Sequence, residues 1–128
     1  MSVREDSLTR AGAYQDTHLV INYQRQRVLL DGELVTLTRK EYELLALLCQ
    51  NAGEIVPRPV LLSRIWNYGQ GVRSRTLDVH IRRLRKKLGP LADRYIETIF
   101  GVGYRFQPYR SRTPAFVLQP LAPLPAMA

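Results

Sequence analysis

The sequence lacks the features that mark a membrane protein, a disulfide-stabilised protein or a metalloprotein. Its 128 residues contain no run of eighteen apolar residues, so no segment is long enough to cross a bilayer as a helix. The N-terminus has no apolar core of a secretion signal. One cysteine, Cys49, cannot form a disulfide within the chain, and two histidines provide no metal-ligand cluster. These absences favour a cytoplasmic protein without a metal or other cofactor.

Acidic residues are also scarce. The chain has 19 Lys and Arg against 11 Asp and Glu, which gives a net charge of +8 and a pI near 10.1. This imbalance favours a polyanionic partner, with nucleic acid ahead of an anionic membrane surface. The length suits one domain with a hydrophobic core. No nucleophile–base pair or carboxylate dyad is visible, so we do not expect an enzyme.

The basic residues concentrate in the segment 74–88, SRTLDVHIRRLRKKL, which is predicted to be a helix. Ser74 is a good N-cap, and Gly89 followed by Pro90 is a stop signal. Apolar residues recur at steps of four, three and four, which places them on one narrow stripe. The stripe contains Leu77, Ile81, Leu84 and Leu88. The opposite side carries Arg75, Val79, Arg83 and Lys86, flanked by Asp78 and Arg82 on one edge and by Thr76 and Lys87 on the other.

The charge of this helix points to a polyanion. The stretch 73–87 contains seven basic residues and one acid. Ordinary surface helices mix Glu with Lys for mutual support, whereas like charges at this density repel each other unless a polyanion neutralises them. An Arg beside a small apolar residue also suits the major groove, because Arg can bond guanine twice and a methyl group can touch thymine. A solvated surface helix is the alternative.

The rest of the chain predicts a small α+β domain between two tails. Residues 1–17 are expected to be a flexible tail, and residues 108–128 a disordered tail rich in proline. Three short strands form an antiparallel meander, with Asp31-Gly32 as a two-residue hairpin turn. These strands are expected at 18–23, 27–30 and 33–37.

Two more helices and a hairpin follow the meander. A capping box at Thr38-Arg-Lys-Glu41 starts a helix that runs to about Asn51. After an extended link at Ile55-Val56, prolines at 57 and 59 open a second helix. Residues 95–106 read as a hairpin whose tip contains Gly101 and Gly103. The expected core comprises Leu45, Leu48, Leu62, Ile65, Trp66, Leu77, Ile81, Leu84 and Ile99.

Three stretches together resemble a known family. DGELVTLTRKEYELLALLCQNAGEIV, RTLDVHIRRLRKKLG and YIETIFGVGYRF are similar to the OmpR/PhoB-type winged-helix DNA-binding domain of bacterial response regulators, the effectors of two-component phosphorelay systems. The resemblance covers about residues 18–107. It implies a winged helix-turn-helix with an N-terminal meander, three helices and a C-terminal hairpin wing. It also implies sequence-specific binding of double-stranded DNA by a transcriptional regulator, as a tandem dimer. A protein-interaction module that docks an acidic partner is the alternative.

The resemblance assigns roles to individual residues. Arg75, Thr76, Val79 and Arg83 match positions that face the major groove, and Arg75, His80 and Thr98 match positions that touch the DNA backbone. The loop 66–74 matches a segment that contacts RNA polymerase or its σ subunit. By charge and geometry alone, Arg82, Lys86 and Lys87 are candidates for contact with phosphate. Arg73 is a further candidate for DNA contact.

The sequence departs from the family pattern at several places. Phe100 precedes the wing glycines where relatives often carry an Arg that enters the minor groove. Either the Phe ring packs against sugar or bases, or this contact is absent. Arg73-Ser74 replaces residues that are often acidic, which makes the polymerase-facing loop more basic. The seventeen residues before the domain cannot hold a phosphorylated receiver, so the expectation is an excised effector domain or a free-standing regulator.

Overall fold

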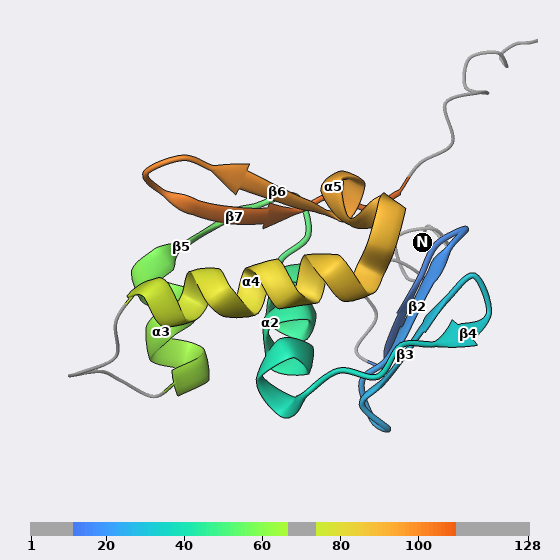
Figure 1. Ribbon diagram of the computed structural model, residues 1–128. Coiled ribbons are helices and arrows are strands. Elements are labelled where there is room, and N and C mark those ends of the chain that lie inside the picture. Colours follow the sequence, from blue (N-terminus) through green and yellow to red (C-terminus); the bar gives the residue numbers. More distant parts are fainter. Residues whose placement is uncertain (1–11, 67–73, 110–128) are drawn as a thin grey trace, which may run out of the picture.

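The computed structural model describes residues 12–66 and 74–109, which form two small antiparallel sheets and three longer helices (Figure 1). The first sheet contains β1 (Ala13–Gln15), β2 (Leu19–Asn22), β3 (Arg27–Leu30) and β4 (Glu33–Leu34). The longer helices are α2 (Arg39–Gln50), α3 (Arg58–Trp66) and α4 (Ser74–Leu88). The second sheet contains β5 (Ile55–Pro57), β6 (Ile96–Ile99) and β7 (Gly103–Phe106), and α4 leads to β6 through the 3-10 turn η1 (Gly89–Leu91) and α5 (Ala92–Tyr95).

The first sheet is a meander in the order β1-β2-β3-β4. The predicted turn between β3 and β4 is confirmed, since Asp31 and Gly32 have φ values of 51° and 84°, as a type I′ hairpin turn requires. The expected flexible tail of residues 1–17 is wrong at its C-terminal end. Residues 13–15 pair with β2 as β1, and Tyr14 is fully buried. Three residues with one inward side chain are too short a pattern to reveal a strand.

The capping box of α2 is confirmed. The backbone N–H of Glu41 donates to the Thr38 hydroxyl at 3.2 Å, and the backbone N–H of Thr38 donates to the Glu41 carboxylate at 2.9 Å. Asn51 caps the other end of the helix, and Gly53 follows with a φ of 87°. The N–H of Gly53 donates to the Phe106 carbonyl at 2.9 Å, which ties the end of α2 to the last strand.

The helices pack on a common core through the predicted stripe of α4. Its four apolar residues, Leu77, Ile81, Leu84 and Leu88, are at most 1% exposed. Gly89 ends the helix with a φ of 68°, as the stop signal predicted. Leu62 and Trp66 are only partly buried, and the prediction that Ile99 belongs to the core is wrong. Ile96 is buried instead, because β6 turns residues 96 and 98 toward α4.

The hairpin of β6 and β7 has a third strand that was not predicted. β5, expected only as an extended link, pairs with β7, so the sheet order is β5-β7-β6. Gly101 makes the turn with a φ of 80°. At Gly103 a side chain is excluded for steric reasons, because a Cβ atom there would lie 2.1 Å from the Val56 carbonyl oxygen. Residues 89–95, which join α4 to the hairpin, form η1 and α5.

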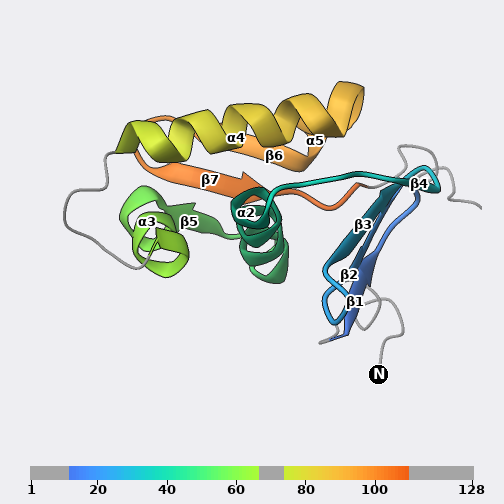
Figure 2. The same ribbon diagram turned by 60° about the horizontal axis from the view of Figure 1, so that its bottom comes forward.

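Two views fix the position of α4 in the molecule. In Figure 2, α4 lies along the top of the domain, α2 and α3 lie below it, and the hairpin of β6 and β7 runs alongside it. The first sheet lies near the C-terminal end of α4, and the tip of the hairpin lies near its N-terminal end (Figures 1 and 2). The arrangement leaves one long face of α4 open.

Candidate nucleic-acid interface

The open face of α4 is cationic. Arg75, Arg82, Arg83 and Lys86 are exposed, and none of them forms an ion pair with an acid in the part of the chain that the structure describes. Val79 and Thr76 lie among them and are half-buried. The helix therefore presents four exposed positive charges around a small apolar side chain and a hydroxyl side chain. We call this the outer face of α4.

One edge of α4 contacts α2 and α3, and it takes Lys87 away from the outer face. The Lys87 ammonium donates to the Glu41 carboxylate at 2.6 Å, and this carboxylate is 2% exposed. Lys87 was expected to touch DNA phosphate. In the structure its ammonium joins α4 to the capping box of α2, and the phosphate contact of Lys87 stays a prediction.

His80 lies on the same edge and keeps one nitrogen available. Its Nδ1 donates to the Thr76 carbonyl at 2.8 Å, and its ring meets the edge of Trp66 with ring centres 5.0 Å apart. These two contacts fix the orientation of the imidazole. Nε2 is then the only ring nitrogen left for the phosphate contact that the resemblance implies.

The other edge of α4 is bonded to the hairpin. The Asp78 carboxylate pairs with the Arg58 guanidinium at 2.8 Å and accepts from the Tyr104 hydroxyl at 3.0 Å. The hydrogen bond from Arg58, aided by Tyr104, outweighs partial burial and lowers the pKa of Asp78 below its ordinary value. The single acid of the basic helix is therefore ionised and neutralised within the protein. Tyr104 is 5% exposed, so its ring is buried in the domain and does not face solvent.

Arg85 makes a second bridge to the hairpin. One of its guanidinium nitrogens, Nη2, donates to the Ile96 carbonyl at 2.8 Å and to the Thr98 hydroxyl at 2.7 Å. The Thr98 hydroxyl keeps its own proton and can still donate to a phosphate. Sequence reasoning missed this role of Arg85, because no local pattern distinguishes an arginine that bridges elements from one that faces solvent.

The tip of the wing carries an exposed aromatic ring. Phe100 is 89% exposed in the turn between β6 and β7. Arg73 and residues 67–73 of the expected polymerase-facing loop 66–74 lie outside the described residues. The structure thus places Thr98 against Arg85 of α4 and Phe100 in the exposed turn of the hairpin.

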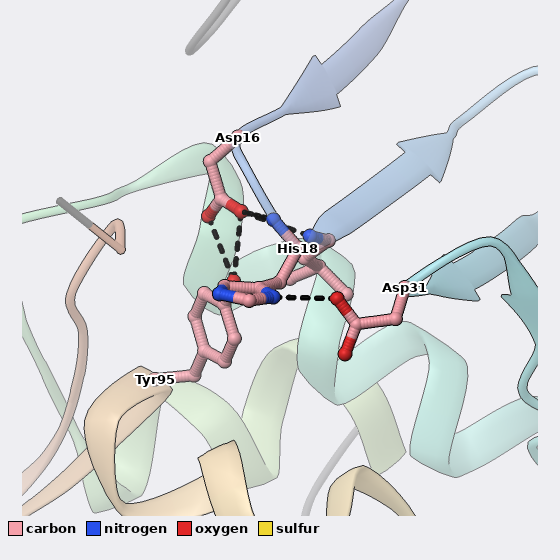
Figure 3. A network of polar contacts seen from close by, with 5 residues as sticks. Asp16, His18, Asp31 and Tyr95 are labelled. Carbon is pink, nitrogen blue, oxygen red and sulfur yellow. Dashed lines mark hydrogen bonds and ion pairs between the residues drawn. The ribbon is translucent and has the colours of Figure 1, made fainter. Parts of the chain in front are cut away.

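A polar cluster away from α4 joins the first sheet to the end of the domain (Figure 3). The Asp16 carboxylate accepts from the hydroxyl of Tyr95 at 2.8 Å and from the hydroxyl of Tyr14. It also accepts from three backbone N–H groups, those of His18, Leu19 and Tyr109. Burial, followed by hydrogen bonding to this carboxylate, raises the pKa of both tyrosines. The cluster joins the first sheet to α5 and to the segment that follows β7.

Other kinds of site find no support among residues 12–66 and 74–109. No group of three or more His, Cys, Asp or Glu side chains there is arranged to hold a metal ion. Cys49 is fully buried, and burial raises the pKa of its thiol to about 12. Over the same residues, no helix combines the length and apolarity needed to cross a membrane.

Known proteins resemble this chain over the domain just described. The model of the C-terminal domain of transcriptional regulatory proteins matches residues 32–106. ResD of Bacillus subtilis is 43% identical over 94 residues, which cover 71% of this chain and 39% of ResD. SrrA of Staphylococcus aureus is 41% identical over 101 residues, which cover 77% of this chain and 42% of SrrA. The chain therefore spans well under half the length of these curated relatives.

Solved structures agree with the sequence relatives. The DNA-binding domain of Klebsiella pneumoniae RstA, in complex with the RstA box, superimposes with a TM-score of 0.68 at 32% identity, over 76% of this chain and 98% of that domain. DrrB of Thermotoga maritima, an OmpR/PhoB homolog, gives a TM-score of 0.69 at 38% identity, over 75% of this chain and 44% of DrrB. With the fold and the matched residues in agreement, this chain belongs to the family of C-terminal domains of OmpR/PhoB-type transcriptional regulatory proteins.

Proposed function

We propose that this domain binds double-stranded DNA in a sequence-specific manner and acts in a transcriptional regulator. The observation that carries the proposal is the outer face of α4, with four exposed basic side chains that have no acidic partner among the described residues. The acid of α4, Asp78, and the neighbouring acid of α2, Glu41, are both paired. A helix with this face fits the major groove in width and in charge.

The side chains of this face divide into two kinds of contact. Arg83 and Val79 lie near its middle, where a guanidinium can bond a guanine and a methyl group can touch a thymine. Arg75, Thr76 and His80 match positions that contact bases or backbone in the family. Arg82 and Lys86, together with the Thr98 hydroxyl, are placed for phosphates. The neighbour RstA, whose structure includes its DNA box, supports a DNA-facing role for this fold.

A selected duplex tests the proposal. The preferred sequence is first selected from a randomised library, and its affinity is then followed by fluorescence anisotropy as salt increases. Several phosphate contacts should give a log–log slope of several units. The double variant Arg82→Ala, Lys86→Ala should lower this slope by about two while the domain stays folded. A flat salt dependence, or stronger binding to an acidic polypeptide, would favour the protein-interaction module instead.

Two partner proposals follow from the family. Two copies should bind direct-repeat half-sites about one helical turn apart, as geometry requires for side-by-side domains on one face of DNA. Sedimentation of the domain with a two-half-site duplex at saturation should show a 2:1 complex, and a 1:1 complex would contradict the tandem arrangement. Contact between the loop 66–74 and RNA polymerase stays a prediction from the resemblance.

A further inference from the structure

The single acid of α4 lies one helical turn from a basic residue of the outer face. Asp78 and Arg82 are four positions apart, so their side chains are neighbours on the surface of the helix, and ion pairs at this spacing are common on exposed helices. Arg82 nevertheless forms no ion pair with an acid among residues 12–66 and 74–109. The carboxylate that could neutralise Arg82 is bonded to other elements instead.

Arg58, the first residue of α3, engages this carboxylate. Its Nη1 atom lies 2.8 Å from the Oδ1 atom of Asp78, and the Tyr104 hydroxyl donates to the same oxygen at 3.0 Å. The hydrogen bond from Arg58 lowers the pKa of Asp78 most, and the nearby charge of Arg82 lowers it further. Asp78 is therefore an ionised acid between two cations, and Arg58 is the one that holds it.

Arg58 is the better-placed partner because it is already ordered. Its backbone N–H donates to the Val102 carbonyl at 2.9 Å, and its guanidinium carbon lies 6.0 Å from the centre of the Tyr104 ring. Its side chain is 27% exposed, so solvent screens its attraction to Asp78 only in part. Arg82 is exposed, and it would lose side-chain entropy to form an ion pair that solvent screens more strongly.

We propose that Arg58 is a positioning residue for DNA binding, which leaves Arg82 free for a phosphate by engaging Asp78. This inference rests on the proposed function. Without Arg58, the Asp78 carboxylate would pair with Arg82, and the outer face would lose one of its four exposed positive charges. An acid four residues before a base pairs better than an acid that follows a base, which favours Arg82 over Arg75 as the new partner.

The salt dependence of DNA binding is the readout, because the number of phosphates neutralised sets the slope of log affinity against log salt. Arg58→Met should lower this slope on the selected duplex by about one. Arg58→Lys should keep the wild-type slope, since an ammonium can still engage Asp78. Arg27→Met is the matched control, because it removes an exposed charge from β3 in the first sheet and should leave the slope unchanged.

Two double variants separate positioning from a direct contact of Arg58 with DNA. Adding Asp78→Asn to Arg58→Met should restore the slope, because Arg82 is free again. Adding Arg82→Ala to Arg58→Met should lower the slope no further, because the Arg82 charge is already neutralised. If the losses of Arg58→Met and Arg82→Ala add, or if Asp78→Asn restores nothing, the proposal is wrong. A less stable Arg58→Met variant with the wild-type slope would overturn it as well, since Arg58 would then serve only the fold.

Binding is measured at a temperature at which circular dichroism shows every variant to be folded. If Arg58→Met does not fold, Arg58→Gln, which keeps a hydrogen-bond donor near Asp78 without the charge, replaces it in every comparison.

The domain without DNA gives an independent test, in which NMR follows the carboxyl pKa of Asp78. Arg82→Ala should raise this pKa more in the Arg58→Met background than in the wild type, because only there does Arg82 pair with Asp78. Equal shifts in the two backgrounds would overturn the proposal even if the domain binds DNA. If the wild type selects no duplex, the proposed function fails, and the NMR result alone decides whether Arg58 keeps Asp78 from Arg82.

Discussion

At the scale of single residues, Arg83 and Lys86 lie on the same open face of α4, but Arg83 should contact a base and Lys86 should contact phosphate. Arg83 lies beside Val79 near the middle of the helix, whereas Lys86 lies in its last turn. Arg83→Ala should therefore cost about 1–3 kcal/mol on the preferred duplex and relax the base preference at one position. Lys86→Ala should weaken all sequences equally and lower the salt slope by about one.

Both variants are compared on a randomised-site library. If Arg83→Ala keeps the wild-type sequence preference and loses only overall affinity, Arg83 contacts phosphate and another residue reads the base. Lys86 is the comparison residue here because the ammonium of Lys87 is occupied by Glu41.

The pair of Glu41 and Lys87 should make the stability of the domain depend on pH in acid. Burial alone would raise the pKa of Glu41, but hydrogen bonds from Lys87 and Thr38 outweigh it and hold the pKa below its ordinary value of 4.5. Because the folded-state pKa is depressed, the stabilisation is complete above about pH 4.5 and is lost as the pH falls through the folded-state pKa.

Lys87→Met tests this pair. It should lower the free energy of unfolding by roughly 1–3 kcal/mol at pH 7, because the buried Glu41 carboxylate loses a partner, and by much less at pH 3. Urea denaturation at both pH values measures the difference. A loss of equal size at pH 7 and pH 3 would show that the pair does not set the pKa of Glu41.

At the scale of elements, the buried stripe of α4 should be indispensable for folding. Ile81 is 1% exposed, so Ile81→Asp places a charge where neither water nor a partner can reach it, and the domain should unfold. Arg82→Asp, one residue further on the exposed side, should fold but lose affinity for DNA. Thermal denaturation followed by circular dichroism distinguishes the two, and a cooperative transition of Ile81→Asp at the wild-type temperature would contradict the assigned packing.

Elements whose signals are local were predictable from the sequence. The repeat of Leu77, Ile81, Leu84 and Leu88 and the capping box at Thr38 are both complete within a few residues, and the structure confirms both. β1 and the pairing of β5 were not predictable, because their partners are supplied by tertiary contacts that short segments do not encode. The same reason explains why the contacts of Lys87 and Arg85 were not predictable. Their charge was visible in the sequence, but the Glu41 and Thr98 side chains that engage them come from other elements.

At the scale of the whole molecule, Asp16 should contribute much of the free energy that holds the first sheet against the rest of the domain. Its carboxylate accepts from two tyrosine hydroxyls and three backbone N–H groups. Asp16→Ala leaves these donors without their acceptor and should lower the free energy of unfolding by about 2–5 kcal/mol. Asp31→Asn is the control, because Asn tolerates the φ of 51° at this turn position. The side chain of Asp31 is 59% exposed and pairs with His18, so loss of its charge should cost under about 1 kcal/mol.

Chemical denaturation of both variants measures these losses of stability. DNA binding at a temperature where both variants are folded shows whether the outer face of α4 is intact. Equal stability of the two variants would show that Asp16 is not the main attachment. A fragment that begins at residue 18, the domain boundary expected from the sequence, lacks Asp16 and should be destabilised in the same way.

The bonds of Asp16 also bear on the order in which the chain folds. The carboxylate joins residues separated by 79 positions at Tyr95 and by 93 at Tyr109. Contacts across such separations require the closure of long loops, so they carry a large entropic penalty until nearer elements have formed. We therefore expect the contacts of Asp16 to form after the helices, once the chain has passed the transition state of folding. Asp16→Ala should then accelerate unfolding and leave the refolding rate almost unchanged, which makes Asp16 a determinant of the lifetime of the folded domain.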